Sequence, residues 1–162
     1  CRVKALFSND TIQHAGIVIG IGGVGGHSHK YFGRNQHGYF SRLKLTQTVS
    51  GVTAACLIIR RSVYDKVGGL DEVNLKVAFN DVDFCLKVRE AGYRNLWTPY
   101  AELYHHESIS RGTEDSPEKQ ARFKGEVEFM QTKWGEALKS DPFYSPNLTK
   151  DREDFSIGFR HA

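Results

Sequence analysis

The sequence has little cysteine and no long apolar run. Its three cysteines show no Cys-x-x-Cys spacing, which argues against a disulfide scaffold and against a structural zinc site. No apolar run approaches the roughly 20 residues of a membrane-spanning helix, and the first residues do not have the pattern of a signal peptide. Cys56 and Cys85 lie in apolar runs, so we interpret them as buried free thiols of a reducing compartment.

Charge of one sign is not in excess either. The 22 Lys and Arg residues are interspersed with 19 Asp and Glu residues, giving a formal net charge of +3, so a polybasic surface is not indicated and we expect no nucleic-acid partner. With 40% hydrophobic and 25% charged residues, the composition excludes a disordered, collagenous or coiled-coil chain. A length of 162 residues is that of one domain, and we expect residues 1–162 to form one.

The order of the expected elements predicts an α/β fold. Apolar runs predict strands over residues 3–7, 16–21, 52–59, 94–98 and 101–104, and the glycine-rich residues 20–38 predict a long loop. The run over 52–59 is apolar almost throughout, as in a central strand covered on both faces. Helices are expected over residues 63–67, about 81–91 and about 117–139. Asn80 is the expected N-cap of the second, and Ser116 followed by Pro117 begins the third.

The most conspicuous literal motif is Gly-x-Gly-x-x-Gly over residues 20–25, directly after an expected strand. A dinucleotide site needs these glycines to open a helix and an acidic residue about 20 positions later. Neither an amphipathic pattern nor such an acid follows. A flexible glycine loop is therefore the favoured interpretation, with dinucleotide binding as the weaker alternative.

Two further segments could carry chemistry. Asp81 and Asp83 fall in the first turn of an expected helix, where one carboxylate can face a substrate hydroxyl as a base while the other anchors the helix; a simple capping pair is the alternative. His105 and His106 follow a strand, and at most one of them is expected to bind a metal ion, with a surface pair as the alternative. Arg111, in the polar loop that follows, could reach a phosphate oxygen.

Taken together, several segments resemble a known family. TAACLIIRRSVYDKVGGLDE, FNDVDFCLKVREAGYRNLWTPYAELYHHESISRG and DPFYSPNL, in this order and spacing, are similar to the C-terminal half of family 2 glycosyltransferases. TIQHAGIVIGIGGVGGH resembles the preceding segment in bacterial cell-surface polysaccharide and rhamnosyl-type members. The resemblance covers about residues 3–148. It implies a GT-A fold, with a mixed sheet and flanking helices, and an inverting transfer from a nucleotide-sugar donor to a glycan acceptor.

The resemblance also implies roles for particular residues. Asp81 matches the base of the family's Glu-Asp-x-Asp segment, although Asn80 replaces the commoner Glu, and His105 matches a late metal-binding histidine. The expected substrate-binding residues are Ala54, Ala55, Asp71, Glu72, Asp83 and Arg111. A divalent cation, Mn²⁺ or Mg²⁺, is the implied cofactor. The location expected is the cytoplasm, including the inner face of the membrane.

One departure from the family concerns the donor. The family holds its nucleotide with an N-terminal sheet half that ends in an Asp-x-Asp motif, and residues 1–162 do not contain such a half. We therefore expect a fragment that is inactive alone, with the strand over residues 3–7 and the run over 52–59 left partly uncovered, and a homodimer that covers them. The alternative is a module that binds a glycan or a partner chain without turnover.

Overall fold

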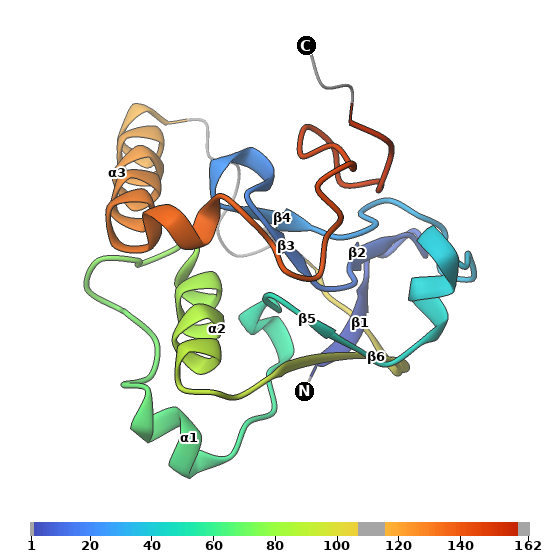
Figure 1. Cartoon of the computed structure of the whole chain (residues 1–162), viewed down its shortest axis with the longest axis horizontal. Helices are drawn as coiled ribbons and strands as arrows, with labels where there is room; N and C mark the ends of the chain where they lie inside the picture. The colour runs from blue at the N-terminus through green and yellow to red at the C-terminus, as the bar shows by residue number, and fades with distance from the viewer. Residues whose placement is uncertain (1, 107–115, 159–162) are drawn as a thin grey trace.

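The computed structural model describes residues 2–106 and 116–158, in which five strands are followed by two helices, a sixth strand and a third helix (Figure 1). The strands are β1 (Arg2–Leu6), β2 (Ile12–His14), β3 (Ile17–Ile19), β4 (Gly25–His27), β5 (Gln47–Val49) and β6 (Asn95–Tyr104). The helices are α1 (Arg61–Lys66), α2 (Asn80–Glu90) and α3 (Pro117–Trp134). A mixed α/β fold with helices beside the sheet, as the sequence predicts, is confirmed.

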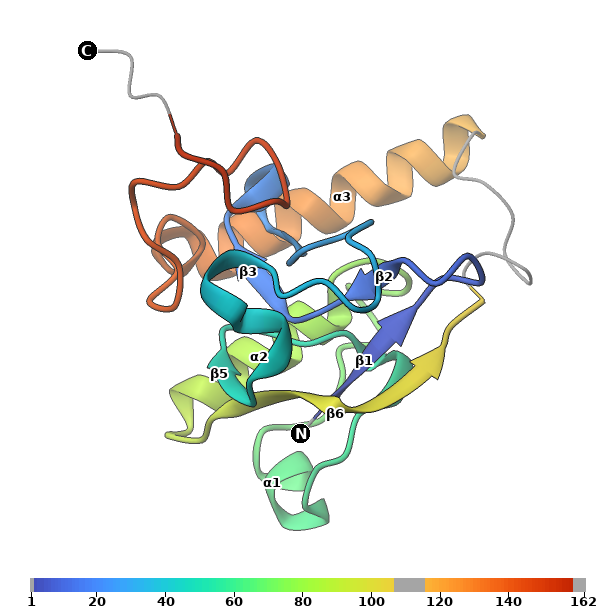
Figure 2. The ribbon, with the colours of Figure 1, turned by 90° about the vertical axis from the view of Figure 1, so that its right-hand side faces the viewer.

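The main sheet has the strand order β2-β1-β6-β5. β1 runs parallel to β6, with Ala5 opposite Leu103, whereas β2 and β5 are antiparallel to their neighbours. Figure 2 shows β1 and β6 side by side. β1 is not an edge strand, because β2 and β6 flank it; Leu6 is fully buried, while Val3 and Phe7, at the ends of the segment expected to be partly uncovered, are half-buried. The homodimer stays a prediction.

Residues 28–38 form turns and irregular backbone, as expected of a long loop, but the first part of the glycine-rich segment does not. A 3-10 turn over Ile21–Gly23 is followed by β4, which pairs antiparallel with β3. Gly26 lies in β4, and a Cβ atom there would overlap the Ile21 side chain, so the close approach explains this glycine. Because the glycines lead into a strand and open no helix, dinucleotide binding through this motif is not supported.

The segment predicted as a central strand, residues 52–59, is also different. Val52 is buried, but the chain then makes the 3-10 turn Ala54–Cys56 and continues in extended backbone with Ile58 68% exposed. None of the six described strands runs through it. An apolar run forms a central strand only where neighbouring strands supply its hydrogen bonds. The pattern of apolar residues along the sequence does not show whether such neighbouring strands exist.

Helix α2 begins and ends almost where the sequence predicts. Its N-cap is Phe79, in the left-handed region with a φ of 61°, so the expectation that Asn80 caps the helix is wrong by one residue. At the other end Gly92, with a φ of 85°, donates to the Arg89 carbonyl. Val82 and Leu86 face the helix that follows later in the chain.

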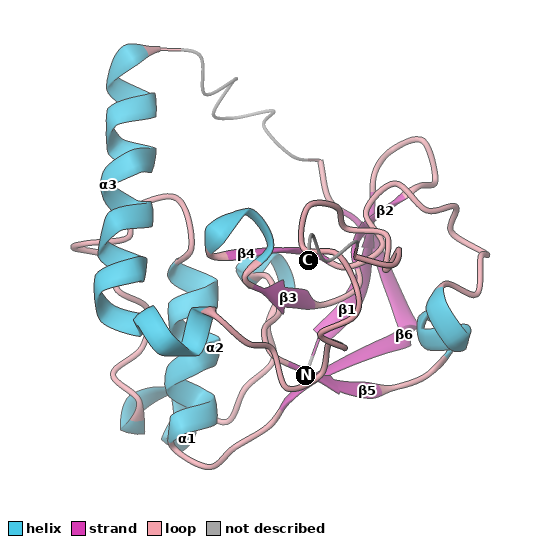
Figure 3. Ribbon diagram, turned by 45° about the horizontal axis from the view of Figure 1, so that its top comes forward, coloured by secondary structure: helices cyan, strands magenta, loops and turns pink. Residues whose placement is uncertain are grey.

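Helix α3 lies against α2 on one side of the sheets (Figure 3). Ser116 caps it as predicted, its Oγ accepting from the Lys119 amide at 3.3 Å. Met130 and Trp134 are buried against α2, while Phe123 remains 44% exposed. The helix ends at Trp134, earlier than expected, because Gly135 starts a 3-10 turn, Gly135–Leu138, that places Leu138 in the same core.

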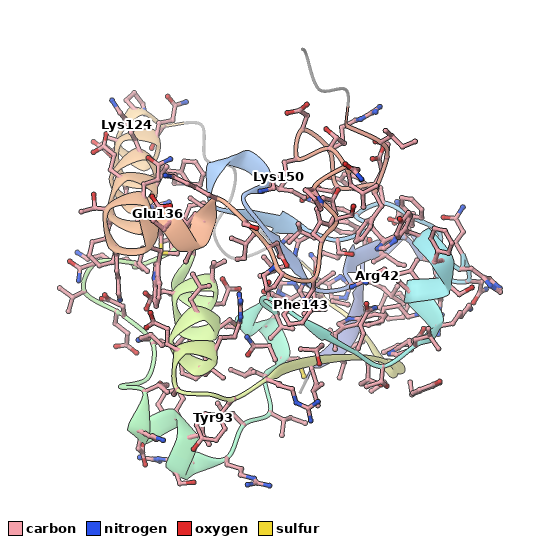
Figure 4. The ribbon with its side chains drawn as sticks, in the orientation of Figure 1. Arg42, Tyr93, Lys124, Glu136, Phe143 and Lys150 are labelled. Carbon is pink, nitrogen blue, oxygen red and sulfur yellow. The ribbon has the colours of Figure 1, made fainter. Side chains whose placement is uncertain are left out.

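The C-terminal segment packs beside the β3–β4 hairpin. Tyr144, Leu148 and Phe155 form a cluster with Val18 and Ile21. Figure 4 shows Phe143 and Lys150 on this segment; the Lys150 ammonium donates to the Lys139 carbonyl at 2.7 Å. The C-terminal segment therefore buries one face of the β3–β4 hairpin.

His29 is a buried neutral histidine inside this part of the core. Its Nε2 accepts from the Tyr39 amide at 3.0 Å, and its ring stacks on Phe155 with the centroids 4.4 Å apart. Burial and the nearby Arg42 guanidinium lower the pKa of His29 to about 4. The unfolded chain binds this proton near pH 6.5 and the folded protein near pH 4, so stability falls as the pH drops through this window.

We therefore expect the free energy of unfolding to decrease by about 2 kcal/mol between pH 7 and pH 5 through His29 alone. Urea unfolding at both pH values measures this, with His29→Gln as the comparison. The variant is expected to start less stable and to show a smaller pH dependence. An equal pH dependence in both proteins would show that His29 is not the group responsible.

Candidate functional site

Asp81 lies in the first turn of α2, half-buried, and its carboxylate is held from two sides. Oδ2 accepts from the Ala54 amide at 3.0 Å, and Oδ1 accepts from the Val82 amide at 2.9 Å. Both donors and the N-terminal end of the helix stabilise a negative charge. The contact also joins two segments 27 residues apart, so two of the residues predicted from the sequence, Asp81 and Ala54, meet in the structure.

A buried histidine supports the turn that contacts Asp81. His14, only 1% exposed at the end of β2, accepts from the Thr53 amide at 3.4 Å and from the Gly16 amide at 3.3 Å through Nε2. Because Thr53 immediately precedes Ala54, consecutive amides of this turn are bound by His14 and by Asp81. The turn is therefore fixed at both residues.

A second histidine completes the arrangement. The Nδ1 atoms of His14 and His27 lie 2.9 Å apart, and since Nε2 of His14 accepts hydrogen bonds, its Nδ1 is the donor in this pair. The β3–β4 pairing, with Ile17 opposite His27, brings the second ring back to the first. The sequence analysis did not identify His14 or His27 as site residues. The two rings meet only because β4 pairs with β3, and the glycine-rich composition of this segment did not predict that hairpin.

Asp83 points away from this site into the interface between α2 and α3. Its side chain is fully buried, and its Oδ1 accepts from Trp134 Nε1 at 2.8 Å and pairs with the Lys133 ammonium at 2.6 Å. Lys87 pairs with the other oxygen at 3.2 Å. Asp83 is therefore placed as expected of the carboxylate that anchors the helix. Its burial between α2 and α3 does not favour the substrate-binding role that was also predicted for it.

The segment 71–75 forms its own turn. Asp71 Oδ1 accepts from the Val73 and Asn74 amides, and these bonds, those from Asn74 above all, lower the pKa of Asp71. Glu72 is exposed. Within residues 2–106 and 116–158, no hydrogen bond joins Asp71 or Glu72 to Asp81, so their role at the acceptor side stays a prediction, as does that of the exposed Ala55.

His105 is held at the ends of β1 and β2. Its Nδ1 lies 2.7 Å from Gln13 Oε1, and its amide donates to the Leu6 carbonyl at 2.9 Å. His106 is exposed. In the described part of the chain, no three His, Cys, Asp or Glu side chains gather in a group that could hold a metal ion. The metal role of His105 stays a prediction, and Arg111 lies outside the described residues.

The described chain is thus a mixed α/β domain in which an anchored carboxylate meets a turn held by a histidine pair. Over nearly its whole length it is similar to bacterial proteins much longer than itself. None of the helices in the described residues is both long and apolar enough to cross a membrane. No family model matches the chain, and no solved structure matches it significantly.

Three bacterial proteins illustrate this similarity. The uncharacterized protein y4gI of Sinorhizobium fredii is 58% identical over 154 residues, which is 95% of this chain and 17% of that protein. The O-antigen biosynthesis protein RfbC of Myxococcus xanthus is 35% identical over 158 residues, 95% of this chain and 12% of that protein. The N-acetylglucosaminyl-diphospho-decaprenol L-rhamnosyltransferase of Mycobacterium tuberculosis is 32% identical over 82 residues, 51% of this chain and 26% of that protein. The chain therefore spans less than a fifth of the length of the first two.

Proposed function

We propose that this chain is the acceptor-side part of a glycosyltransferase, one that transfers a sugar from a nucleotide-sugar to a glycan acceptor. The observation that carries the proposal is the anchored Asp81 carboxylate, in a chain similar to a rhamnosyltransferase and to an O-antigen biosynthesis protein. The class of the sugar is proposed from the rhamnosyltransferase name, and the nucleotide-binding half of the GT-A fold is proposed to lie in a longer protein.

In the proposed reaction Asp81 acts as the base. Its carboxylate accepts the proton of an acceptor hydroxyl while that oxygen forms a bond to the anomeric carbon of the donor sugar. The bond from this carbon to the diphosphate breaks on the opposite face, and the diphosphate leaves with the electron pair, so the configuration is inverted. The amides of Ala54 and Val82 orient the carboxylate for this transfer and hold it in place.

The residues described do not fit the divalent cation that the family resemblance implies. Mn²⁺ and Mg²⁺ take several oxygen ligands, whereas His105 offers one ring nitrogen and no three candidate ligands gather in the described residues. The proposed reaction therefore includes no step that depends on a metal ion.

The proposal is tested by transfer from radiolabelled nucleotide-sugars to lipid-linked or free glycan acceptors. Two proteins are compared: this chain, and a longer protein that carries it together with its upstream sequence. We expect label in the glycan with the longer protein and none with the chain alone. A longer protein that binds glycans but transfers no sugar from any donor would instead support the non-catalytic module.

A further inference from the structure

A hollow among the described residues lies away from Asp81, at the end of the main sheet where β1 and β6 finish. It measures about 710 Å³ and is lined by Asp10, Gly33, Arg34, Asn35, Gln36 and Glu102. The segment around Gly33 reaches this place because it pairs with Thr11, just before β2. Neither the proposed reaction nor any motif in the sequence accounts for it.

The charged side chains of the hollow are already held in position. The Arg34 guanidinium binds Glu102 Oε2 through Nε at 2.9 Å and through Nη2 at 2.7 Å, and its Nη1 reaches Asp10 Oδ1 at 3.3 Å. Lys4 pairs with Glu102 from the buried side. A ligand therefore meets groups that are fixed before it binds, which lowers the entropy cost of binding.

The chemistry of the lining favours a neutral ligand with many hydroxyl groups. Two carboxylates and two basic groups balance in charge, so the hollow attracts neither a phosphate nor a strongly cationic partner. The amides of Asn35 and Gln36 offer both donors and acceptors, as a sugar hydroxyl requires. The lining is too polar for an apolar peptide or a lipid chain.

Strand β2 connects this hollow to the Asp81 site. His14 follows Asp10 by four positions, so their Cα atoms are at most about 14 Å apart. His14 in turn binds the turn whose next amide contacts Asp81. The hollow and the Asp81 turn are thus joined through one short strand.

We propose that the hollow lined by Asp10, Arg34, Asn35 and Glu102 is a glycan subsite, which binds a sugar unit of the acceptor remote from the hydroxyl that reacts. The inference rests on the proposed function in taking the acceptor to be a glycan. It goes beyond that function in assigning a second contact region for the acceptor, with Asn35 as its adaptable hydrogen-bonding group.

The test is an amide-resolved NMR titration of this chain, whose dispersed spectrum also reports that it is folded. The probes are short rhamnose-, glucose- and N-acetylglucosamine-based oligosaccharides, with uridine diphosphate as the charged comparison. At least one oligosaccharide is expected to shift the amides of residues 33–36, and uridine diphosphate is expected to leave them in place. Asn35→Ala is expected to weaken the binding about tenfold, because one or two hydrogen bonds to the sugar are lost.

The matched control is Asn147→Ala, which removes another exposed asparagine from the C-terminal segment and is expected to leave the affinity unchanged. Shifts confined to the Thr53–Ala54 turn, shifts caused by uridine diphosphate at residues 33–36, or no shift with any oligosaccharide would each overturn the subsite. The proposed function fails separately: a longer protein that transfers no sugar, combined with normal glycan binding at residues 33–36, rejects the transferase and keeps the subsite.

Discussion

Replacing Asp81 with asparagine, in a transfer-competent protein that carries this segment, is expected to lower kcat by about 10²–10⁴-fold, the range that a general base contributes. Asparagine keeps the size of the side chain, and its carbonyl oxygen can still accept one of the two amide hydrogen bonds that now reach the carboxylate from Ala54 and Val82. It cannot take the proton of the acceptor hydroxyl. Initial rates at saturating donor and acceptor measure the loss.

The control for this substitution is Asp154→Asn. Asp154 also accepts an amide hydrogen bond within a tight turn, from Ser156 at 3.0 Å, but it has no hydrogen bond to the Asp81 turn within the described residues. We expect that variant to keep kcat within a few-fold of the wild type. If both variants lost turnover equally, or if Asp81→Asn kept it, Asp81 would not be the base.

The largest effect on stability is expected at Asp83. Replacing it with alanine removes the buried carboxylate that pairs with Lys87 and Lys133 and accepts from Trp134. Removing the carboxylate leaves the buried indole N–H of Trp134 without its acceptor, whereas Lys87 and Lys133, with side chains 19% and 34% exposed, can turn to solvent, so the cost is about 1–3 kcal/mol. The midpoint of urea unfolding should therefore fall, and the contact between α2 and α3 should be lost first.

Asp65→Ala is the matched control, because Asp65 also pairs with a basic side chain four residues away, Arg61 Nε at 2.8 Å, but on an exposed helix surface. Exposed pairs contribute at most about 1 kcal/mol, so this variant should unfold close to the wild type. An equally small loss in Asp83→Ala would mean that the buried carboxylate does not hold the two helices together.

The helices could be predicted from the sequence because their signals are local. The Ser116 cap, Gly92 in the left-handed region after α2 and the spacing of Met130 and Trp134 all act within a few residues of one another. The first-turn position of Asp81 followed from the same signals. That part of the candidate site was therefore accessible without a structure.

The remaining parts depend on pairing between distant segments. Residues 52–59 have the composition of a central strand, yet no described strand runs through them. The histidine pair exists only because β4 pairs with β3, and the hollow exists only because residue 33 pairs with residue 11. Composition and periodicity do not encode these partners, so the support of the Asp81 site and the glycan subsite could not be anticipated.

The most direct test of the central claim, that Asp81 removes the acceptor proton, is chemical rescue of the turnover of Asp81→Ala by an added small carboxylate such as formate. The account predicts that Asp81→Ala loses turnover as Asp81→Asn does, and that formate restores part of it by accepting the proton in place of the missing side chain, whereas Asp81→Asn, whose amide fills the same place, is not rescued. Turnover of Asp81→Ala close to the wild type, or no response of this variant to formate at any concentration, would contradict the assignment and would place the base elsewhere.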